Sequence, residues 1–205
     1  MDKQYELRKE YASDHAVSEY SGLPNENNTQ GWNDLIKTTW FVASKEMLAM
    51  TGESIDNSVM LADGGYLAGL GVYHDIHCLR RLRLYLHADY YYEELTEANL
   101  KYLREHLGHC IEALRKPVMC TVDTSIYTFT WDNATERRPN PKSNQHRKCL
   151  NWESLQEWLS STGKKVPLNP MLVRPTGVKD RILMRSLSSS TQEDTPEPKG
   201  RRDPR

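Results

Sequence analysis

The spacing of apolar residues in the middle of the chain predicts two long helices with leucine stripes. From Val72 to about His87, and again from about Thr96 to Arg115, leucines recur at intervals that place them on one face of a helix. The stripe residues are Leu79, Leu82 and Leu86 in the first helix, and Leu100, Leu103, Leu107 and Leu114 in the second. We expect the two helices to lie antiparallel, with these leucines packed inward.

Shorter patterns predict smaller elements around this pair. Short helices are expected from Trp32 and from Ser44, and Gly52 ends the second of them. Residues 125–131 alternate and are rich in β-branched and aromatic side chains, which predicts a strand. Asn151 is expected to cap a last helix. We expect four tryptophans in the core, namely Trp32, Trp131, Trp152 and Trp158.

The ends of the chain are polar. We expect a flexible N-terminal segment at residues 1–17, a single compact domain at residues 18–165, and a largely irregular or disordered tail at residues 166–205. Hydrophobic residues make up 38% of the chain and charged residues 27%, which agrees with long polar segments. The expected fold class is mainly α with a small β element, built on the antiparallel helix pair.

Charge and hydropathy exclude several classes of partner. The formal net charge is −1, so we expect no nucleic-acid partner. No stretch approaches the ~18 apolar residues of a membrane-spanning helix, and the first ten residues carry charges where a signal peptide is apolar. The chain as given is therefore expected to be soluble. Asn27 and Asn133 begin sequons and are candidate glycosylation sites.

One histidine-rich pentad falls in each of the two long predicted helices. Residues 74–78 read His-Asp-Ile-His-Cys, and residues 106–110 read His-Leu-Gly-His-Cys. Positions i, i+3 and i+4 share a helix face, so the side chains of each pentad point together. Neutral imidazole is a good ligand for copper, zinc and iron. The metal candidates are His74, His77, His106 and His109.

The pentads leave three interpretations open. Cys78 and Cys110 can be thiolate ligands of a closed zinc site that only holds the fold. They can instead form a disulfide that clamps the helices, with Cys120 and Cys149 as the second bridge. Equivalent positions on facing helices favour this interpretation, because they can bring two Cα atoms within the ~4.4–6.8 Å that a disulfide requires. In the third interpretation the histidines are ordinary half-buried residues without a metal.

The wider pattern resembles the UstYa-like proteins of fungal mycotoxin and peptide natural-product pathways. The similarity runs from about Tyr20 to Trp158. Beyond the pentads it includes Ser21-Gly22-Leu23-Pro24, Gly31-Trp32-Asn33-Asp34-Leu35, Met119-Cys120 and Cys149. The resemblance implies oxidative tailoring of unactivated C–H or O–H bonds, with copper on the four pentad histidines. It also implies that Cys78 and Cys110 clamp the helices and do not bind the metal.

We therefore predict a copper-dependent oxidase that uses O2 to tailor a fungal secondary metabolite by oxidative cyclisation, hydroxylation or desaturation of a peptide or peptide-like precursor. The alternatives are zinc or iron as the metal, a halogenase or dehydratase on the same scaffold, and a non-catalytic partner protein of the pathway. A second UstYa-like protein is the expected partner in a homo- or hetero-oligomer. The resemblance implies a secretory-pathway lumen, although the membrane-spanning helix with which family members commonly begin is not found in this sequence.

Overall fold

Helices and antiparallel strands together make up about two thirds of the described part of the chain. The computed structural model describes residues 4–8, 18–92, 94–131, 137–143, 145–161, 165–166 and 172–173. About half of these residues are helical. The expected mixture of helices with some β structure is confirmed, but the strands are more numerous than the sequence suggested. No helix within the described ranges has the length and apolar character needed to cross a bilayer.

Four of the six helices in the described ranges begin at a residue whose side chain caps them. Their bounds are α1 Glu26–Ile36, α2 Lys45–Thr51, α3 Gly71–Leu86, α4 Ala88–Tyr91, α5 Glu97–Cys120 and α6 Trp152–Ser160. The side chains of Ser44, Thr96 and Asn151 accept hydrogen bonds from backbone N–H groups in the first turns of α2, α5 and α6. Gly52 ends α2 with a left-handed conformation at φ 77°. The predicted cap at Asn151 and the predicted end of α2 at Gly52 are therefore confirmed.

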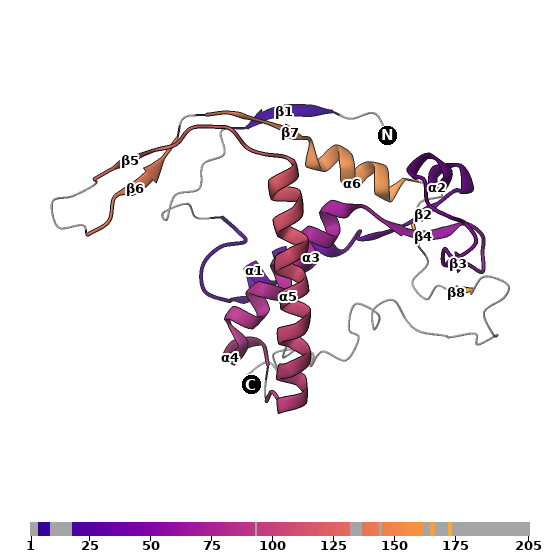
Figure 1. Cartoon of the computed structure of the whole chain (residues 1–205), viewed down its shortest axis with the longest axis horizontal. Helices are drawn as coiled ribbons and strands as arrows, with labels where there is room; N and C mark the ends of the chain where they lie inside the picture. Colours follow the sequence, from indigo (N-terminus) through magenta and orange to yellow (C-terminus); the bar gives the residue numbers. More distant parts are fainter. Residues whose placement is uncertain are drawn as a thin grey trace.

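The strands form three small antiparallel sheets. Their bounds are β1 Tyr5–Arg8, β2 Trp40–Ala43, β3 Met60–Leu61, β4 Tyr66–Gly69, β5 Thr128–Thr130, β6 Asn140–Lys142, β7 Arg147–Leu150 and β8 Leu172–Val173. The largest sheet has the order β2-β4-β3-β8, while β1 pairs with β7 and β5 pairs with β6. Figure 1 shows the β5–β6 ribbon reaching away from the helices. The predicted strand at 125–131 corresponds to β5, whereas β1 was not expected.

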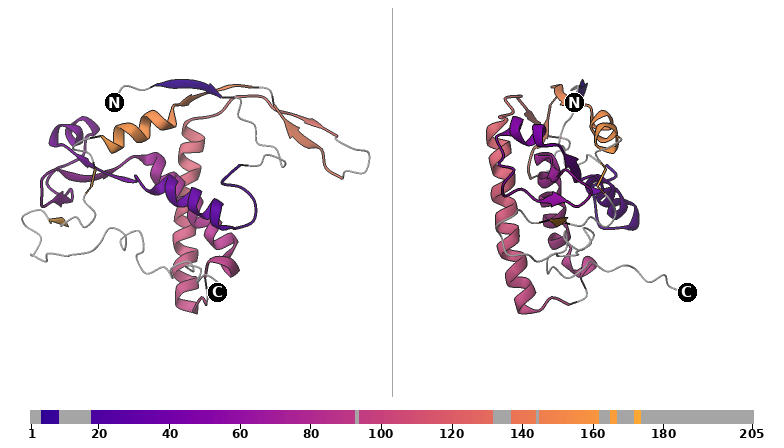
Figure 2. Two further views of the ribbon diagram at one scale, coloured as in Figure 1. Left: turned by 180° about the vertical axis from the view of Figure 1, so that it is seen from behind. Right: turned by 90° about the vertical axis from the view of Figure 1, so that its right-hand side faces the viewer.

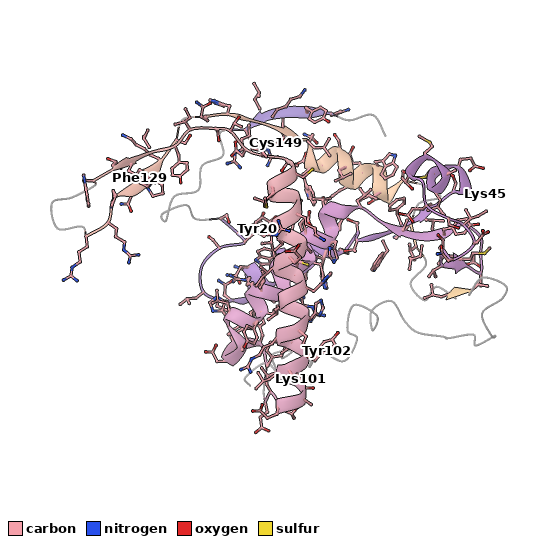
Figure 3. All side chains as sticks on the ribbon, viewed as in Figure 1. Tyr20, Lys45, Lys101, Tyr102, Phe129 and Cys149 are labelled. Atoms are coloured by element: carbon pink, nitrogen blue, oxygen red, sulfur yellow. The ribbon has the colours of Figure 1, made fainter. Side chains whose placement is uncertain are left out.

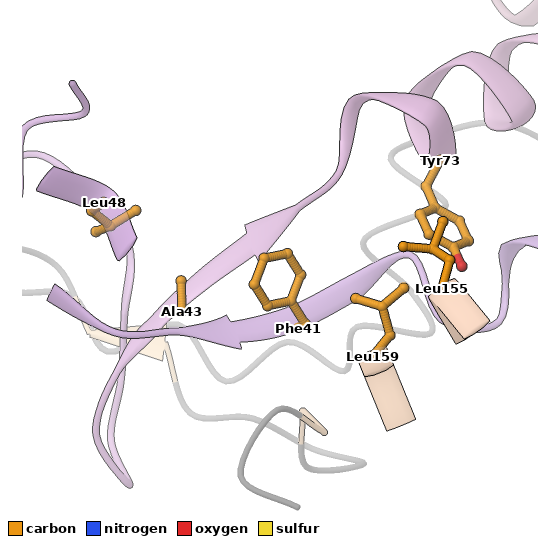
Figure 4. Packing of buried hydrophobic residues seen from close by; sticks show 6 residues of the cluster. All are labelled: Phe41, Ala43, Leu48, Tyr73, Leu155 and Leu159. Atoms are coloured by element: carbon orange, nitrogen blue, oxygen red, sulfur yellow. The ribbon is translucent and has the colours of Figure 1, made fainter. Parts of the chain in front are cut away.

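Helix α6 covers the sheet and completes the main core. Its buried leucines, Leu155 and Leu159, pack against Phe41 and Ala43 of β2 (Figure 4). Tyr73, in the first turn of α3, is fully buried in the same cluster. Its hydroxyl accepts a 2.9 Å hydrogen bond from Thr38. This contact fixes the start of α3 beside the start of β2, which matters for the site below.

Helices α3 and α5 pack against each other at the centre of the molecule. The two helices are adjacent in both views of Figure 2, and α1 lies against α3. The contact with α1 includes a 2.7 Å hydrogen bond from Arg80 to Asn33. At the far end of α3, Leu84 packs with Tyr91 and Tyr92 in a second buried cluster.

The leucine stripe expected for α3 is wrong. Leu79 and Leu86 are 46% and 75% exposed. The buried residues of α3 are instead Tyr73, Cys78, Arg81 and Leu84. At about 100° per residue these positions lie on the same side of the helix as the pentad histidines, so α3 turns its pentad face, and not its leucine face, toward its neighbours. For α5 the prediction holds, since Leu103 and Leu107 are buried and the other two stripe leucines are half-buried.

Of the four tryptophans expected in the core, Trp152 and Trp158 pack against the main core, whereas Trp131 does not. Trp131 is 61% exposed beyond the end of β5, because this ribbon projects from the body. Trp32, Trp152 and Trp158 are half-buried, and each contacts a buried or half-buried aromatic ring. The predicted domain boundaries at 17/18 and 165/166 fall beside residues that are not described, and they stay predictions.

Candidate functional site

The two pentads lie on facing turns of neighbouring helices. Residues 74–78 belong to α3 and residues 106–110 to α5. The rings form two cross-helix pairs. The ring centres of His74 and His109 are 5.7 Å apart, and those of His77 and His106 are 6.1 Å apart. The structure therefore brings together all four histidines that the sequence identified as metal candidates.

These histidines line one pocket of about 380 Å³. The complete lining consists of Thr39, Trp40, Gly69, Leu70, Gly71, His74, His77, Arg81, Tyr102, His106 and His109. His74 and His109 form an exposed outer pair, and His77 and His106 form a half-buried inner pair. A volume of this size is typical of small-molecule sites. The pocket therefore has room for a ligand in addition to the rings.

Burial and positive charge keep the inner histidines neutral. Desolvation, followed by the charge of Arg81, lowers the pKa of His77 to about 4. The same two causes, in the same order, lower the pKa of His106. Neutral imidazole is the form that binds metal ions. The inner pair is therefore in its ligand form throughout the physiological pH range.

The spacing of each ring pair suits a shared metal ion. With metal–nitrogen bonds of about 2.0–2.1 Å, two imidazoles on one ion have ring centres roughly 5–6 Å apart. The separation of 5.7 Å between His74 and His109 falls within this range, and that of 6.1 Å between His77 and His106 lies just above it. As they stand, no three His, Cys, Asp or Glu side chains in the described part of the chain converge closely enough to hold an ion. A site that uses three or more of these rings therefore requires their side chains to move.

The pentad cysteines lie between the helices. Cys78 and Cys110 are both fully buried thiols. Burial, with a further contribution from the adjacent Cys110, raises the pKa of Cys78 to about 12. This thiol is therefore protonated in the metal-free chain, and a zinc–thiolate site would require it to lose its proton when the metal binds. The closed zinc interpretation stays open. The Cys78–Cys110 disulfide stays a prediction, and the adjacency of the two thiols is compatible with it.

The other two cysteines are also thiols in the structure. Cys120 is the exposed last residue of α5, and Cys149 is half-buried in β7. Figure 3 shows Cys149 at the C-terminal end of α5. A 2.5 Å ion pair between Arg147 and Asp123 joins β7 to the segment that follows α5. The second bridge, between Cys120 and Cys149, also stays a prediction.

Of the two candidate glycosylation sites, only Asn27 lies among the described residues. Asn27 is exposed in the first turn of α1. The hydroxyl of Thr29, the third residue of its sequon, is 3.0 Å from the Tyr91 hydroxyl. Asn133 lies outside the described residues. Modification of either asparagine stays a prediction.

Three further side chains of the pocket were not among the predicted site residues. Arg81 follows His77 by four residues and His74 by seven, and this helical spacing is the signal that could have identified it. Tyr102 contacts the His106 ring edge-on at 5.8 Å. Trp40 packs over Gly69, where a Cβ would come within 3.3 Å of the indole. Its position depends on β2–β4 pairing, which no local pattern reveals.

Comparisons with known proteins relate this chain to one protein family. The family model described as "Mycotoxin biosynthesis protein UstYa" matches residues 1–162. The UstYa family oxidase phomYc' of Diaporthe leptostromiformis is 35% identical over 95 residues, which are 45% of this chain and 37% of that protein. The UstYa family oxidase aprY of Aspergillus flavus is 28% identical over 148 residues, covering 66% of this chain and 44% of the relative.

A third relative bears the name of a different activity. The transacylase cctO of Talaromyces islandicus is 30% identical over 176 residues, covering 77% of this chain and 55% of the relative. The chain therefore spans about half or less of the length of each of these three relatives. No solved structure matches it.

Proposed function

Because the chain belongs to the UstYa family, we propose that it is a copper-dependent oxidase that tailors a fungal secondary metabolite in the four-histidine pocket. The observation that carries this proposal is the arrangement of the histidines. Two cross-helix pairs with the spacing of shared metal ligands lie in one pocket of about 380 Å³. Relatives named as UstYa family oxidases support an oxidoreductase.

We further infer that α3 and α5 form an antiparallel pair that carries the two pentads. The first histidine of one pentad contacts the last histidine of the other, in both directions. This reciprocal pairing is expected only when the two helices run in opposite directions. It gives each pair one ligand from each helix, so that a bound ion would tie the helices together.

In this proposal His74, His77, His106 and His109 would hold the metal. Copper, when bound, would supply the capacity to activate O2. The protein's own part is to keep the inner imidazoles neutral, to keep water from the half-buried end of the pocket and to present the substrate to the metal. A disulfide between Cys78 and Cys110 would hold the helices at a fixed distance below the histidines.

The substrate proposed is a peptide or peptide-like precursor, and the reaction is an oxidative cyclisation, hydroxylation or desaturation. The name of the relative cctO supports a second candidate, transfer of an acyl group without net oxidation. The two candidates differ in one measurable respect, because only the first consumes O2. A second UstYa-like chain remains the proposed protein partner.

The test is oxygen uptake by the purified chain after loading with copper. With an active substrate, the wild type is expected to consume O2, and His77→Ala is expected to lose turnover. His87→Ala is the matched control, because His87 follows α3 but lies outside the pocket. Copper-independent activity, or full activity in His77→Ala, would contradict the proposal. Product formation without O2 uptake would favour acyl transfer.

A further inference from the structure

The β5–β6 ribbon exposes an aromatic face. Figure 3 shows Phe129 on this ribbon, away from the helices that carry the histidines. Tyr127, Phe129 and Trp131 alternate along the chain and are 60%, 59% and 61% exposed, and the ring centres of Tyr127 and Phe129 are 5.5 Å apart. A two-stranded ribbon is at best marginally stable in water. Further pairing would therefore stabilise it.

The backbone of β5 is open along its outer edge. In the β5–β6 register Phe129 lies opposite Pro141. Opposite residues of an antiparallel pair alternate between those that exchange two hydrogen bonds and those that exchange none, and proline has no N–H to exchange. The Phe129–Pro141 pair is therefore of the second kind, so the N–H and C=O of Phe129 point away from β6. No strand among the described residues pairs with this side of β5.

The two edges of the ribbon differ in their protection against pairing. β6 contains Pro141 and Lys142, and Pro139 precedes it. Proline and lysine are residues that prevent further pairing at an exposed edge. Residues 124–131, which include β5, contain no charged residue, no proline and no glycine. Of these two edges, β5 is thus the one that can accept another strand, and its surface suits an uncharged strand.

The sequence around β5 is symmetric about Phe129. Residues 127–131 read Tyr-Thr-Phe-Thr-Trp, so a threonine and then an aromatic residue stand on each side of Phe129. When two copies of this strand pair antiparallel about Phe129, each threonine faces a threonine and each aromatic residue faces an aromatic residue. Such cross-strand pairs stabilise sheets. A second copy of the chain is therefore the partner that fits this edge.

We propose that two copies of this chain pair through β5 and form one four-stranded antiparallel sheet with the order β6-β5-β5-β6. Phe129 then lies on the two-fold axis, where its backbone exchanges two hydrogen bonds with the same residue of the second copy. Lys142 lies on the outer strand of each copy, so the two lysines do not meet. This inference rests on the proposed function in taking a second UstYa-like chain as the partner, and it involves neither copper nor O2.

The exposed area of the aromatic face sets the expected strength of this contact. About 60% of each of the three aromatic residues is exposed. This corresponds to roughly 100–150 Å² per side chain, and to roughly 600–900 Å² for the six aromatic side chains of a dimer. Interfaces below about 1,200 Å² are typical of weak or transient complexes. We therefore expect half of the chains to be dimeric at roughly 10–100 µM.

The test is sedimentation velocity of the full chain, kept free of metal by a chelator, from about 1 to about 500 µM. The wild type is expected to change from monomer to dimer over this range. Phe129→Lys places two positive charges on the axis and is expected to weaken the dimer at least about tenfold. Leu7→Lys is the matched control, because Leu7 is 72% exposed in a strand of another two-stranded sheet. It is expected to dimerise like the wild type.

A pair of charge variants tests the register. One variant combines Thr128→Lys with Thr130→Lys, and the other combines Thr128→Glu with Thr130→Glu. In the proposed dimer Thr128 of one copy faces Thr130 of the other. Each variant alone is therefore expected to stay monomeric through like-charge repulsion, and an equimolar mixture of the two is expected to dimerise.

Each outcome decides the inference without any measurement of turnover. A wild type that stays monomeric over the whole range would overturn it, as would a dimer that survives in Phe129→Lys or a mixture that associates no better than its components. If Phe129→Lys does not fold, the wild-type series and the mixture still decide. A chain that dimerises through β5 but fails to consume O2 would support the β5 contact and contradict the oxidase. A monomer that consumes O2 would contradict only the β5 contact.

Discussion

The neutral inner histidine makes the metal-free protein sensitive to acid. In the folded chain the pKa of His77 is about 4, against 6.5 for an ordinary histidine, because the ring is partly buried and lies near Arg81. Between these two pH values the unfolded chain binds a proton at His77 that the folded chain does not bind. The contribution to stability is therefore fully present above about pH 6.5 and is lost as the pH falls toward 4.

The size of this effect follows from the width of the window. A difference of one bound proton changes the free energy of unfolding by about 1.4 kcal/mol per pH unit. The full loss of stability between pH 6.5 and pH 4 would therefore be about 3 kcal/mol. Because the His77 ring is only half-buried, solvent screening reduces the expected loss to about 1–2 kcal/mol. His106 titrates in the same direction and adds to the loss.

The assay is urea unfolding of the metal-free chain at several pH values from 7.5 to about 4.5. His77→Gln, which cannot be protonated, is expected to lose less stability over this range than the wild type. His87→Gln, outside the pocket, serves as the control and should behave as the wild type. If the difference in unfolding free energy between wild type and His77→Gln stays constant with pH, protonation of His77 does not destabilise the folded chain and the prediction is refuted.

Three further substitutions and one control substitution test the scaffold by urea unfolding at pH 7.5. Gly65→Ala should destabilise the chain by about 1–3 kcal/mol, because Gly65 has φ 82° and a Cβ would collide with Val42. An unchanged free energy of unfolding would contradict the tight turn described before β4. Leu103→Ala, at a position 2% exposed, should cost about 2–5 kcal/mol, whereas Val118→Ala, 70% exposed on the same helix, should stay within about 0.5 kcal/mol. Asn151→Ala should cost about 1 kcal/mol through loss of the α6 cap, and an unchanged free energy of unfolding would show that the cap is dispensable.

Local signals in the sequence were sufficient to locate the helices that carry the site. The 3.6-residue period predicted helices from Val72 to about His87 and from about Thr96 to Arg115. The observed bounds are Gly71–Leu86 and Glu97–Cys120. The H-x-x-H-C spacing also grouped the histidines correctly, because i, i+3 and i+4 share a face in any helix. These features depend only on residues close together in the sequence.

The orientation of α3 could not be obtained in the same way. This helix is contacted by α1, α4 and α5, and its first turn enters the sheet core through Tyr73, so its buried face is set by several neighbours at once. The leucines at 79 and 86 suggested the opposite face. Arg81 was overlooked for a related reason, because a charged residue is ordinarily expected at the surface.

The pocket walls depend on contacts between distant segments. Trp40 reaches the histidines only because β2 pairs with β4, which places Trp40 opposite Gly69, and because β4 leads directly into α3. The sequence contains no strong alternation at 40–43 or 66–69 that predicts this pairing. The aromatic wall was therefore inaccessible to reasoning from local periodicity.

The central claim is that the two pentads together form one copper site. The most direct measurement adds Cu(II) stepwise to the chain labelled with 15N at histidine and follows the seven histidine signals by NMR, with assignments from single substitutions. The account predicts that paramagnetic broadening removes the signals of His74, His77, His106 and His109 together at about one equivalent, while His87 and His146 remain sharp. Broadening that begins at other histidines, or that affects one pentad and leaves the other sharp, would contradict it.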